Sequence, residues 1–273
     1  MTRSSALAVL GSVIGSVLAL TACGPKDSPA APGADPDALV LRVTQGGGYT
    51  VPGADLGRLP LVSVYRDGRV ITEGPVAAIY PAPAWPNVQV TRLDDDAVTD
   101  LVDAALDAGV TATGDLGSPG LADATTTTIT LVTAAGTSTR EVYALQEGQG
   151  DPALTADQAA ARTALADLVN RLTGVQGDGE TYEPSAVAAL AGSYVPDPDL
   201  ARDPVTWPGA PLPGESVAPG IGCTVSAGAQ ASAVRSAAQD ADGLTPWTDG
   251  AATYAVTFRP LLPDESGCAD LGG

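Results

Sequence analysis

The sequence contains no histidine, and its only lysine is Lys26. The missing imidazole excludes Ser-His-Asp and Cys-His catalytic sites, histidine acid–base catalysis and histidine-ligated zinc or copper. The position of Lys26, close to the N-terminus, excludes a Ser-Lys dyad or a Schiff base in the folded part. We therefore expect a protein that is not an enzyme and that carries no cofactor.

Aromatic residues are also scarce, at 4% of the chain. A paired-carboxylate glycosidase needs only two acids across a cleft, at no fixed sequence spacing, so the absences above leave this class open. Glycosidase clefts are usually lined by aromatic and histidine side chains, and this chain offers few of the first and none of the second. A carboxylate-dependent hydrolase is therefore the alternative to a non-catalytic protein.

Positive charge is scarce as well, because 32 acidic residues face 13 basic ones and give a net charge of −19. Such a surface repels phosphates, so we expect no nucleic-acid partner. Two aspartate clusters have oxygen ligands at spacings that calcium accepts: Asp197, Asp199 and Asp203, and Asp240, Asp242 and Asp249. Prolines interrupt the first cluster, and neither has the loop glycine and distal glutamate of a calcium loop. Solvated turns are the favoured interpretation, and we expect no bound metal.

The N-terminus has the layout of a secretory signal. Arg3 supplies a positive start, and residues 6–20 are uncharged and mostly aliphatic. This run is too short for a membrane span, which needs about 20 apolar residues. It ends in Leu20-Thr21-Ala22-Cys23, which resembles the bacterial lipobox. The resemblance implies cleavage after residue 22 and a diacylglyceryl group, with chains such as palmitate, on Cys23.

A lipid on Cys23 would decide both the compartment and the pairing of the remaining cysteines. Two or more acyl chains hold a protein stably on a membrane, so we expect an anchor at the extracytoplasmic face of the bacterial cell membrane. The alternative is a plain secreted protein with an incidental cysteine. The chain has three cysteines. Acylation of one leaves Cys223 and Cys268, which predict a disulfide in an oxidising compartment.

Composition divides the chain into four segments. Residues 1–22 are the predicted signal peptide, and residues 23–38 are the lipidated cysteine with a flexible tether rich in Pro, Ala, Asp and Gly. Residues 39–178 are predicted to form an α+β N-terminal lobe. Residues 179–273 are predicted to form a smaller C-terminal lobe closed by the disulfide. The two lobes forming one continuous domain stays an open alternative.

Residue patterns predict an α+β fold. Three aspartates at 94–96 mark the start of a helix, its apolar stripe begins at Val98, and Gly109 ends it. Arg66-Asp67-Gly68 between two apolar runs is a hairpin signal. Further helices are expected over 155–172 and 229–238, strands over 39–44, 61–65, 69–72, 88–91, 125–132, 139–145, 186–190 and 251–259, and a long loop over 196–222. We expect an antiparallel sheet built from hairpins with two or three packed helices.

Trp85, Trp207 and Trp247 each lie beside a proline. One interpretation is a ligand-binding surface on which a sugar, a peptide or a cell-wall fragment stacks. The other is that each tryptophan fills one edge of the core beneath a long loop. The sequence leaves both interpretations open.

Three stretches of the chain carry a family resemblance: residues 63–71 (SVYRDGRVI), residues 123–127 (DATTT) with 142–145 (VYAL), and residues 254–265 (YAVTFRPLLPDE). On these stretches the chain resembles a group of uncharacterised actinobacterial secreted lipoproteins. The resemblance implies compartment and lineage, and no assigned activity comes with it.

These observations favour a non-catalytic envelope lipoprotein that binds a partner protein, a cell-wall component or a small ligand. The second hypothesis is a carboxylate-dependent hydrolase that acts on envelope glycans. The third is a structural or accessory subunit of a membrane complex.

Overall fold

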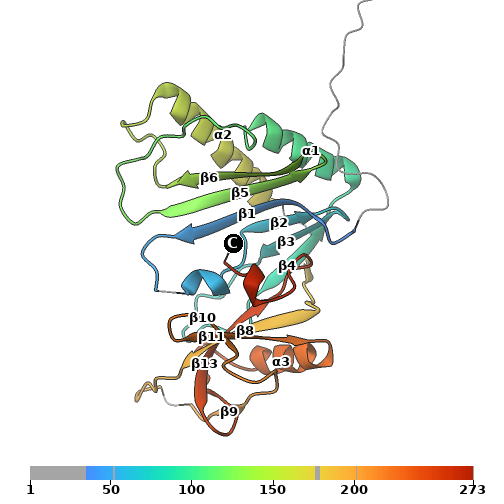
Figure 1. Ribbon diagram of the computed structural model, residues 1–273, viewed down its shortest axis with the longest axis vertical. Coiled ribbons are helices and arrows are strands. Elements are labelled where there is room, and N and C mark those ends of the chain that lie inside the picture. The colour runs from blue at the N-terminus through green and yellow to red at the C-terminus, as the bar shows by residue number, and fades with distance from the viewer. Residues whose placement is uncertain (1–34, 52, 176–178, 201, 273) are drawn as a thin grey trace, which may run out of the picture.

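The computed structural model describes residues 35–51, 53–175, 179–200 and 202–272. The predicted signal peptide, the predicted lipidation site Cys23 and most of the predicted tether lie outside these residues. The described chain forms two sheets and three α-helices, which confirms the predicted α+β class with sheets built from antiparallel hairpins (Figure 1).

The first sheet has the strand order β6-β5-β1-β2-β3-β4-β7, with every neighbouring pair antiparallel. Its strands are β1 (Leu39–Gly47), β2 (Val62–Tyr65), β3 (Arg69–Glu73), β4 (Val88–Arg92), β5 (Thr125–Thr133), β6 (Gly136–Tyr143) and β7 (Glu180–Thr181). The predicted turn between β2 and β3 is confirmed. Its Gly68 has φ 82°, and a Cβ there would lie 2.1 Å from the carbonyl oxygen of Leu93.

Two helices, α1 (Asp95–Asp107) and α2 (Ala156–Thr173), cover one face of this sheet (Figure 1). Asp94 caps α1 by accepting a hydrogen bond from the Ala97 N–H at 2.8 Å, and Thr155 starts α2 in a reciprocal capping box with Gln158. The helices pack on every second residue of the strands, and their aliphatic stripes form the largest core of the molecule. Both predicted helices are confirmed.

The second sheet has the order β10-β11-β8-β13-β12-β9, antiparallel except for the β12–β9 pair. Its elements are β8 (Ala186–Ser193), β9 (Val205–Thr206), β10 (Glu215–Ala218), β11 (Ile221–Ala227), β12 (Trp247–Thr248), β13 (Thr253–Pro260) and the covering helix α3 (Ala229–Gln239). The loop predicted over 196–222 is wrong in part, because β9, β10 and the start of β11 lie within it. Proline and glycine obscure these short strands, and β9 pairs only with β12, which is distant in sequence.

The predicted disulfide is confirmed, with Cys223 bonded to Cys268 and their Cα atoms 6.1 Å apart. Cys223 lies in β11, and Cys268 begins a short 3-10 helix, η2 (Cys268–Asp270). The bond therefore fastens the C-terminal segment, residues 261–272, to the second sheet. Among the helices in the described ranges, none is long and apolar enough to cross a membrane.

The C-terminal segment and β7 connect the two sheets. Leu262 and Tyr182 pack against Tyr65, Ile71 and Val90 on the face of the first sheet that lies opposite the helices. This contact covers the β2–β4 half of that face and leaves the β1–β5 half to line a cavity. The predicted boundary at residue 178 stays a prediction, and β7 just after it pairs with β4 in the first sheet.

Candidate functional site

The face of β1 and β5 opposite the helices is polar because aliphatic and polar side chains alternate along these strands. In β5, Ile129 and Leu131 enter the helical core, and Thr128 and Thr130 between them point to the other side. The register places Thr44 opposite Thr128 and Arg42 opposite Thr130. The outcome is a row of threonines on two adjacent strands, at the edge of the contact between the sheets.

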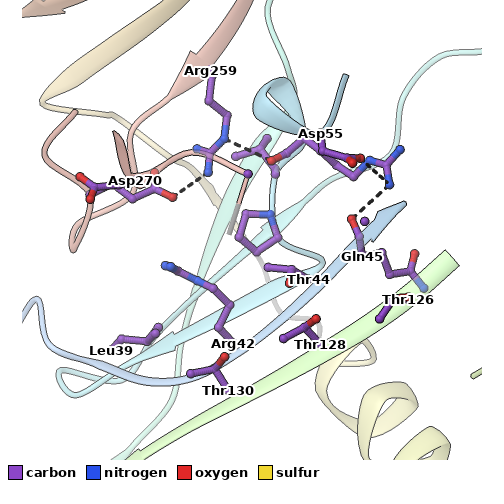
Figure 2. Close-up of a pocket in the computed structure, with 16 residues that line it drawn as sticks. Leu39, Arg42, Thr44, Gln45, Asp55, Thr126, Thr128, Thr130, Arg259 and Asp270 are labelled. Atoms are coloured by element: carbon purple, nitrogen blue, oxygen red, sulfur yellow. Dashed lines mark hydrogen bonds and ion pairs between the residues drawn. The ribbon is translucent and has the colours of Figure 1, made fainter. Parts of the chain in front are cut away.

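A cavity of about 250 Å³ lies above this row. Its floor consists of Thr44 of β1 with Thr126, Thr128 and Thr130 of β5. Arg58 closes one end, just after the short 3-10 helix η1 (Ala54–Gly57). Arg259 at the end of β13, together with Glu265 and Asp270 of the C-terminal segment, forms the opposite wall (Figure 2). The first sheet, η1 and the C-terminal segment thus all contribute side chains to one small space.

The floor threonines have unused hydrogen-bonding capacity. Within the described part of the chain, the hydroxyls of Thr44, Thr126, Thr128 and Thr130 have no hydrogen-bond partner. Thr127, on the opposite face, by contrast accepts a bond from the Gln45 side chain at 3.4 Å. Because a hydroxyl is one donor and two acceptors, the floor can offer each role to a molecule in the cavity.

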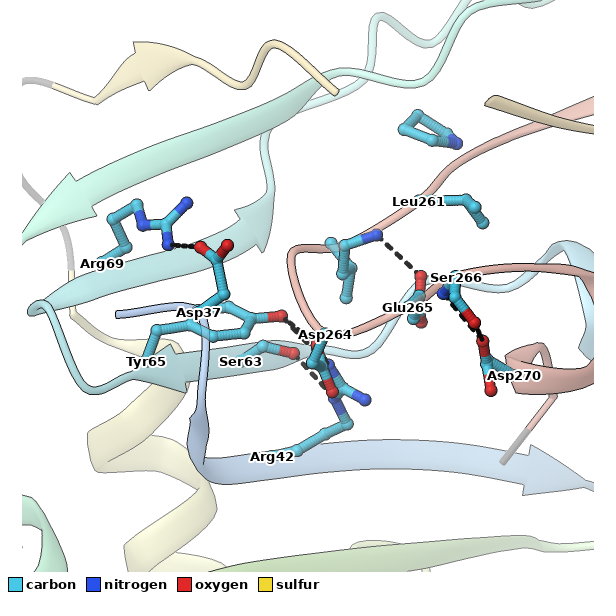
Figure 3. A network of polar contacts seen from close by, with 12 residues as sticks. Asp37, Arg42, Ser63, Tyr65, Arg69, Leu261, Asp264, Glu265, Ser266 and Asp270 are labelled. Atoms are coloured by element: carbon cyan, nitrogen blue, oxygen red, sulfur yellow. Dashed lines mark hydrogen bonds and ion pairs between the residues drawn. The ribbon is translucent and has the colours of Figure 1, made fainter. Parts of the chain in front are cut away.

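Arg42 stands at the inner end of the cavity in a polar network (Figure 3). Its Nε donates to Ser63 Oγ at 3.0 Å, and its Nη2 donates to Tyr65 Oη at 3.0 Å and to Asp264 Oδ1 at 2.7 Å. Tyr65 Oη in turn donates to Asp264 Oδ1 at 2.8 Å. Burial raises the pKa of the Tyr65 phenol far above its usual range, so the phenol keeps the proton it donates.

Arg259 and Glu265 form a buried ion pair in the cavity wall, with side chains only 2% and 4% exposed and 2.7 Å between Nη2 and Oε1. Arg259 also donates to the carbonyl oxygens of Arg58 and Pro260. Glu265 Oε2 accepts the Leu262 N–H at 2.7 Å. These bonds fix the C-terminal segment in position above the first sheet.

Each arginine of the cavity is matched by a carboxylate. Arg42 pairs with Asp264, Arg259 with Glu265, and Arg58 Nη1 lies 3.4 Å from Asp55 Oδ1. A fourth acid, Asp270, accepts hydrogen bonds from the N–H and hydroxyl of Ser266 and from the Gly267 N–H. These bonds lower the pKa of the Asp270 carboxyl, and the bond from the Ser266 N–H is the main cause. These acids act as structural acceptors, and the cavity carries no surplus positive charge.

The three tryptophans pack in the core beside the second sheet, and none of them lines this cavity. Trp207 is 8% exposed and Trp247 is 1% exposed, and the two rings meet edge to face with centroids 5.7 Å apart. Trp85 is partly buried and lies 6.3 Å from the Phe258 ring. Burial leaves Trp207 and Trp247 no open ring face for a ligand, so the core role describes them and the predicted stacking surface does not.

Asp242 and Asp249 of the second aspartate cluster serve the turns in which they occur. Asp242 binds Arg202 at 2.9 Å and accepts the Leu244 N–H, and Asp249 accepts the N–H groups of Ala251 and Ala252. In the ranges that the structure describes, no group of three or more acidic or cysteine side chains is placed to hold a metal ion.

The cavity itself was not predicted from the sequence. Alternation of threonine with aliphatic residues in 125–132 was a usable signal for its floor. The ion pair of Arg42 with Asp264 joins residues 222 positions apart, and no local pattern indicates it. Arg42 thus joins Ser63 and Tyr65 of β2 to Asp264 of the C-terminal segment.

No protein-family model, curated protein or solved structure matches this chain.

Proposed function

We propose that this chain is a lipid-anchored, non-catalytic binding protein of the bacterial envelope, and that the cavity between the two sheets is its binding site. The observation that carries the proposal is the cavity floor, where four threonine hydroxyls without internal partners in the described chain line one cavity. Polar groups that a fold brings together and leaves unsatisfied are typical of a binding site.

Binding is favoured over catalysis by the way the carboxylates are used. A glycosidase needs one acid with a raised pKa and a second that faces it across the substrate. Glu265 is held by Arg259 and the Leu262 N–H, and Asp270 has a lowered pKa because backbone and hydroxyl groups donate to it. Both carboxylates thus already serve as hydrogen-bond acceptors within the fold.

The anchor is favoured by the lipobox-like Leu20-Thr21-Ala22-Cys23. The described chain starts at Asp35 and enters β1 at Leu39. Even fully extended, the chain from Cys23 to Asp35 spans at most about 40 Å. A lipid on Cys23 would therefore keep the cavity close to the extracytoplasmic surface of the cell membrane. Envelope proteins and cell-wall material are the partners available there.

Two measurements in intact bacteria test the two halves of this proposal. Cys23→Ser should move the protein from the membrane fraction to the medium, and Ser28→Ala, in the same segment, should leave it on the membrane. Retention of the Cys23→Ser protein on the membrane would refute the anchor.

For the cavity, a photo-crosslinking amino acid placed at Thr128 should give a specific adduct in intact cells. The matched control carries the crosslinker at Thr163, a residue of α2 on the far side of the first sheet. Equal labelling from the two positions, or none from Thr128, would refute binding in the cavity.

A further inference from the structure

The charges around the cavity restrict the ligands that it can hold. Arg42, Arg58 and Arg259 are each paired with a carboxylate, and Asp270 adds a fourth acid, in a chain of net charge −19. Among the described residues that line the cavity, every cation is paired, and the surrounding field would oppose the approach of an anionic ligand. A cationic ligand would have to compete with the arginines for carboxylates that are already hydrogen-bonded. A neutral ligand meets neither penalty.

The floor has the hydrogen-bonding character of a surface that binds hydroxyl groups. Thr126, Thr128 and Thr130 recur every second residue, at about 6.8 Å along the strand, and Thr44 lies about 4.8 Å away on the neighbouring strand, opposite Thr128. Each hydroxyl both donates and accepts, as the hydroxyls of a sugar do. A ligand that carries several hydroxyls a few ångströms apart can satisfy this floor without bringing charge.

The volume sets the size of the part that enters. About 250 Å³ corresponds to the share of roughly eight liquid water molecules and is below the ~300–1,000 Å³ typical of drug-sized ligands. One ring fits, and the remainder of a longer ligand must continue outside.

An aromatic ring lies on a loop that adjoins the cavity. Gly46 and Asp55 both line the cavity, and the loop between them carries Tyr49, whose side chain is 95% exposed. A tyrosine that is fully exposed on a loop bracketed by two cavity residues gives a flat apolar face beside a polar floor. This combination suits a sugar ring, which has hydroxyls at its edge and C–H groups on its faces.

Resting on the proposed function, we infer that the ligand of this cavity is a neutral glycan, with one sugar ring bound on the threonine floor and the next stacked on Tyr49. The complete chain, purified in detergent, is titrated calorimetrically with neutral trisaccharides of glucose, galactose, mannose and N-acetylglucosamine. Tri-galacturonate supplies the anionic comparison, and tri-alanine supplies a neutral ligand that lacks hydroxyls.

At least one neutral trisaccharide should bind, and Thr128→Val should weaken it about tenfold, because one hydrogen bond is lost at constant shape. Tyr49→Ala should weaken it as well. Thr137→Val, on the exposed β6 strand and outside the cavity lining, is the matched control and should bind as the parent does. Circular dichroism verifies that each variant is folded.

Several outcomes would overturn the inference. If only tri-galacturonate or tri-alanine binds, and Thr128→Val weakens that binding about tenfold, the ligand is not a neutral glycan and the cavity stays a binding site. Binding of a neutral sugar that Thr128→Val and Thr137→Val affect equally would refute the site. Binding of none of the neutral sugars would refute the glycan, and the cellular crosslink at Thr128 would then decide separately whether the proposed function fails with it.

Discussion

The buried ion pair of Arg259 and Glu265 gives the sharpest test of how the C-terminal segment is held. Glu265→Gln keeps the shape of the side chain and removes its charge. Arg259 would stay 2% exposed with its Nη2 facing an amide at the 2.7 Å position of the carboxylate. An uncompensated charge at such a depth is the costly state, whereas the intact pair is close to neutral in its net contribution.

Removing one partner of a buried pair costs about 3–5 kcal/mol. Glutamine can still accept the Leu262 N–H through its carbonyl oxygen, so we expect the lower end, about 3 kcal/mol. For a folded unit of this size that corresponds to a melting temperature lower by about 6–12 °C. Arg259→Met combined with Glu265→Gln should recover most of the loss, because the unpaired charge is then gone.

Urea unfolding followed by tryptophan fluorescence measures these free energies, since Trp207 and Trp247 lie in the core next to β13. Glu183→Gln is the control, because Glu183 pairs with Arg235 at 3.0 Å with its own side chain 75% exposed. That exposed pair should contribute less than about 1 kcal/mol. Equal losses for Glu265→Gln and Glu183→Gln would refute the reasoning, as would a double variant no more stable than Glu265→Gln.

Two further perturbations address the same segment and the acidic turns. The Cys223–Cys268 disulfide closes a loop with a sequence separation of 45, and its reduction should lower the free energy of unfolding by up to about 4 kcal/mol. Paired urea titrations with and without dithiothreitol measure this loss. An unchanged unfolding midpoint would contradict a structural role for the disulfide. For Asp242, desolvation works to raise the pKa, but the bonds from the Leu244 N–H and Arg202 outweigh it, so the folded pKa lies below the unfolded value of about 3.9. The stabilisation by the Asp242 carboxylate is therefore present above about pH 4 and is lost as the pH falls through the folded pKa. Asp242→Asn should make the stability of the protein fall less steeply between about pH 5 and 2. Parallel pH profiles for the variant and the parent would contradict this.

Local signals predicted the helices and hairpins well because the residues that decide them are neighbours in the chain. Asp94 caps α1 from one position upstream, and the positive φ of Gly68 turns the β2–β3 hairpin. The short strand β9 was missed because its partner, β12, lies far along the chain, and β10 was missed because its hairpin with β11 lies in a run rich in proline and glycine. The disulfide followed from counting cysteines, on the expectation that Cys23 is lipidated.

The candidate site could not be predicted in the same way. Its floor depends on which face of β5 the helices cover, and its wall on where the C-terminal segment returns to the first sheet. The tryptophans show the same limit, since their positions beside prolines left a binding surface and a core role both open, and the packing of the second sheet places Trp207 and Trp247 in a core. Long-range packing decides both cases, and sequence patterns over a few residues do not report it.

The central claim, that the cavity between the sheets is the binding site, is tested most directly by methyl NMR of the complete chain with labelled threonines. On addition of the neutral trisaccharide that binds best, the methyl signals of Thr44, Thr126, Thr128 and Thr130 should shift together and saturate with one affinity. The signals of Thr137 on β6 and Thr163 on α2 should stay in place. Shifts confined to other threonines, or none in these four while the sugar binds, would contradict the account.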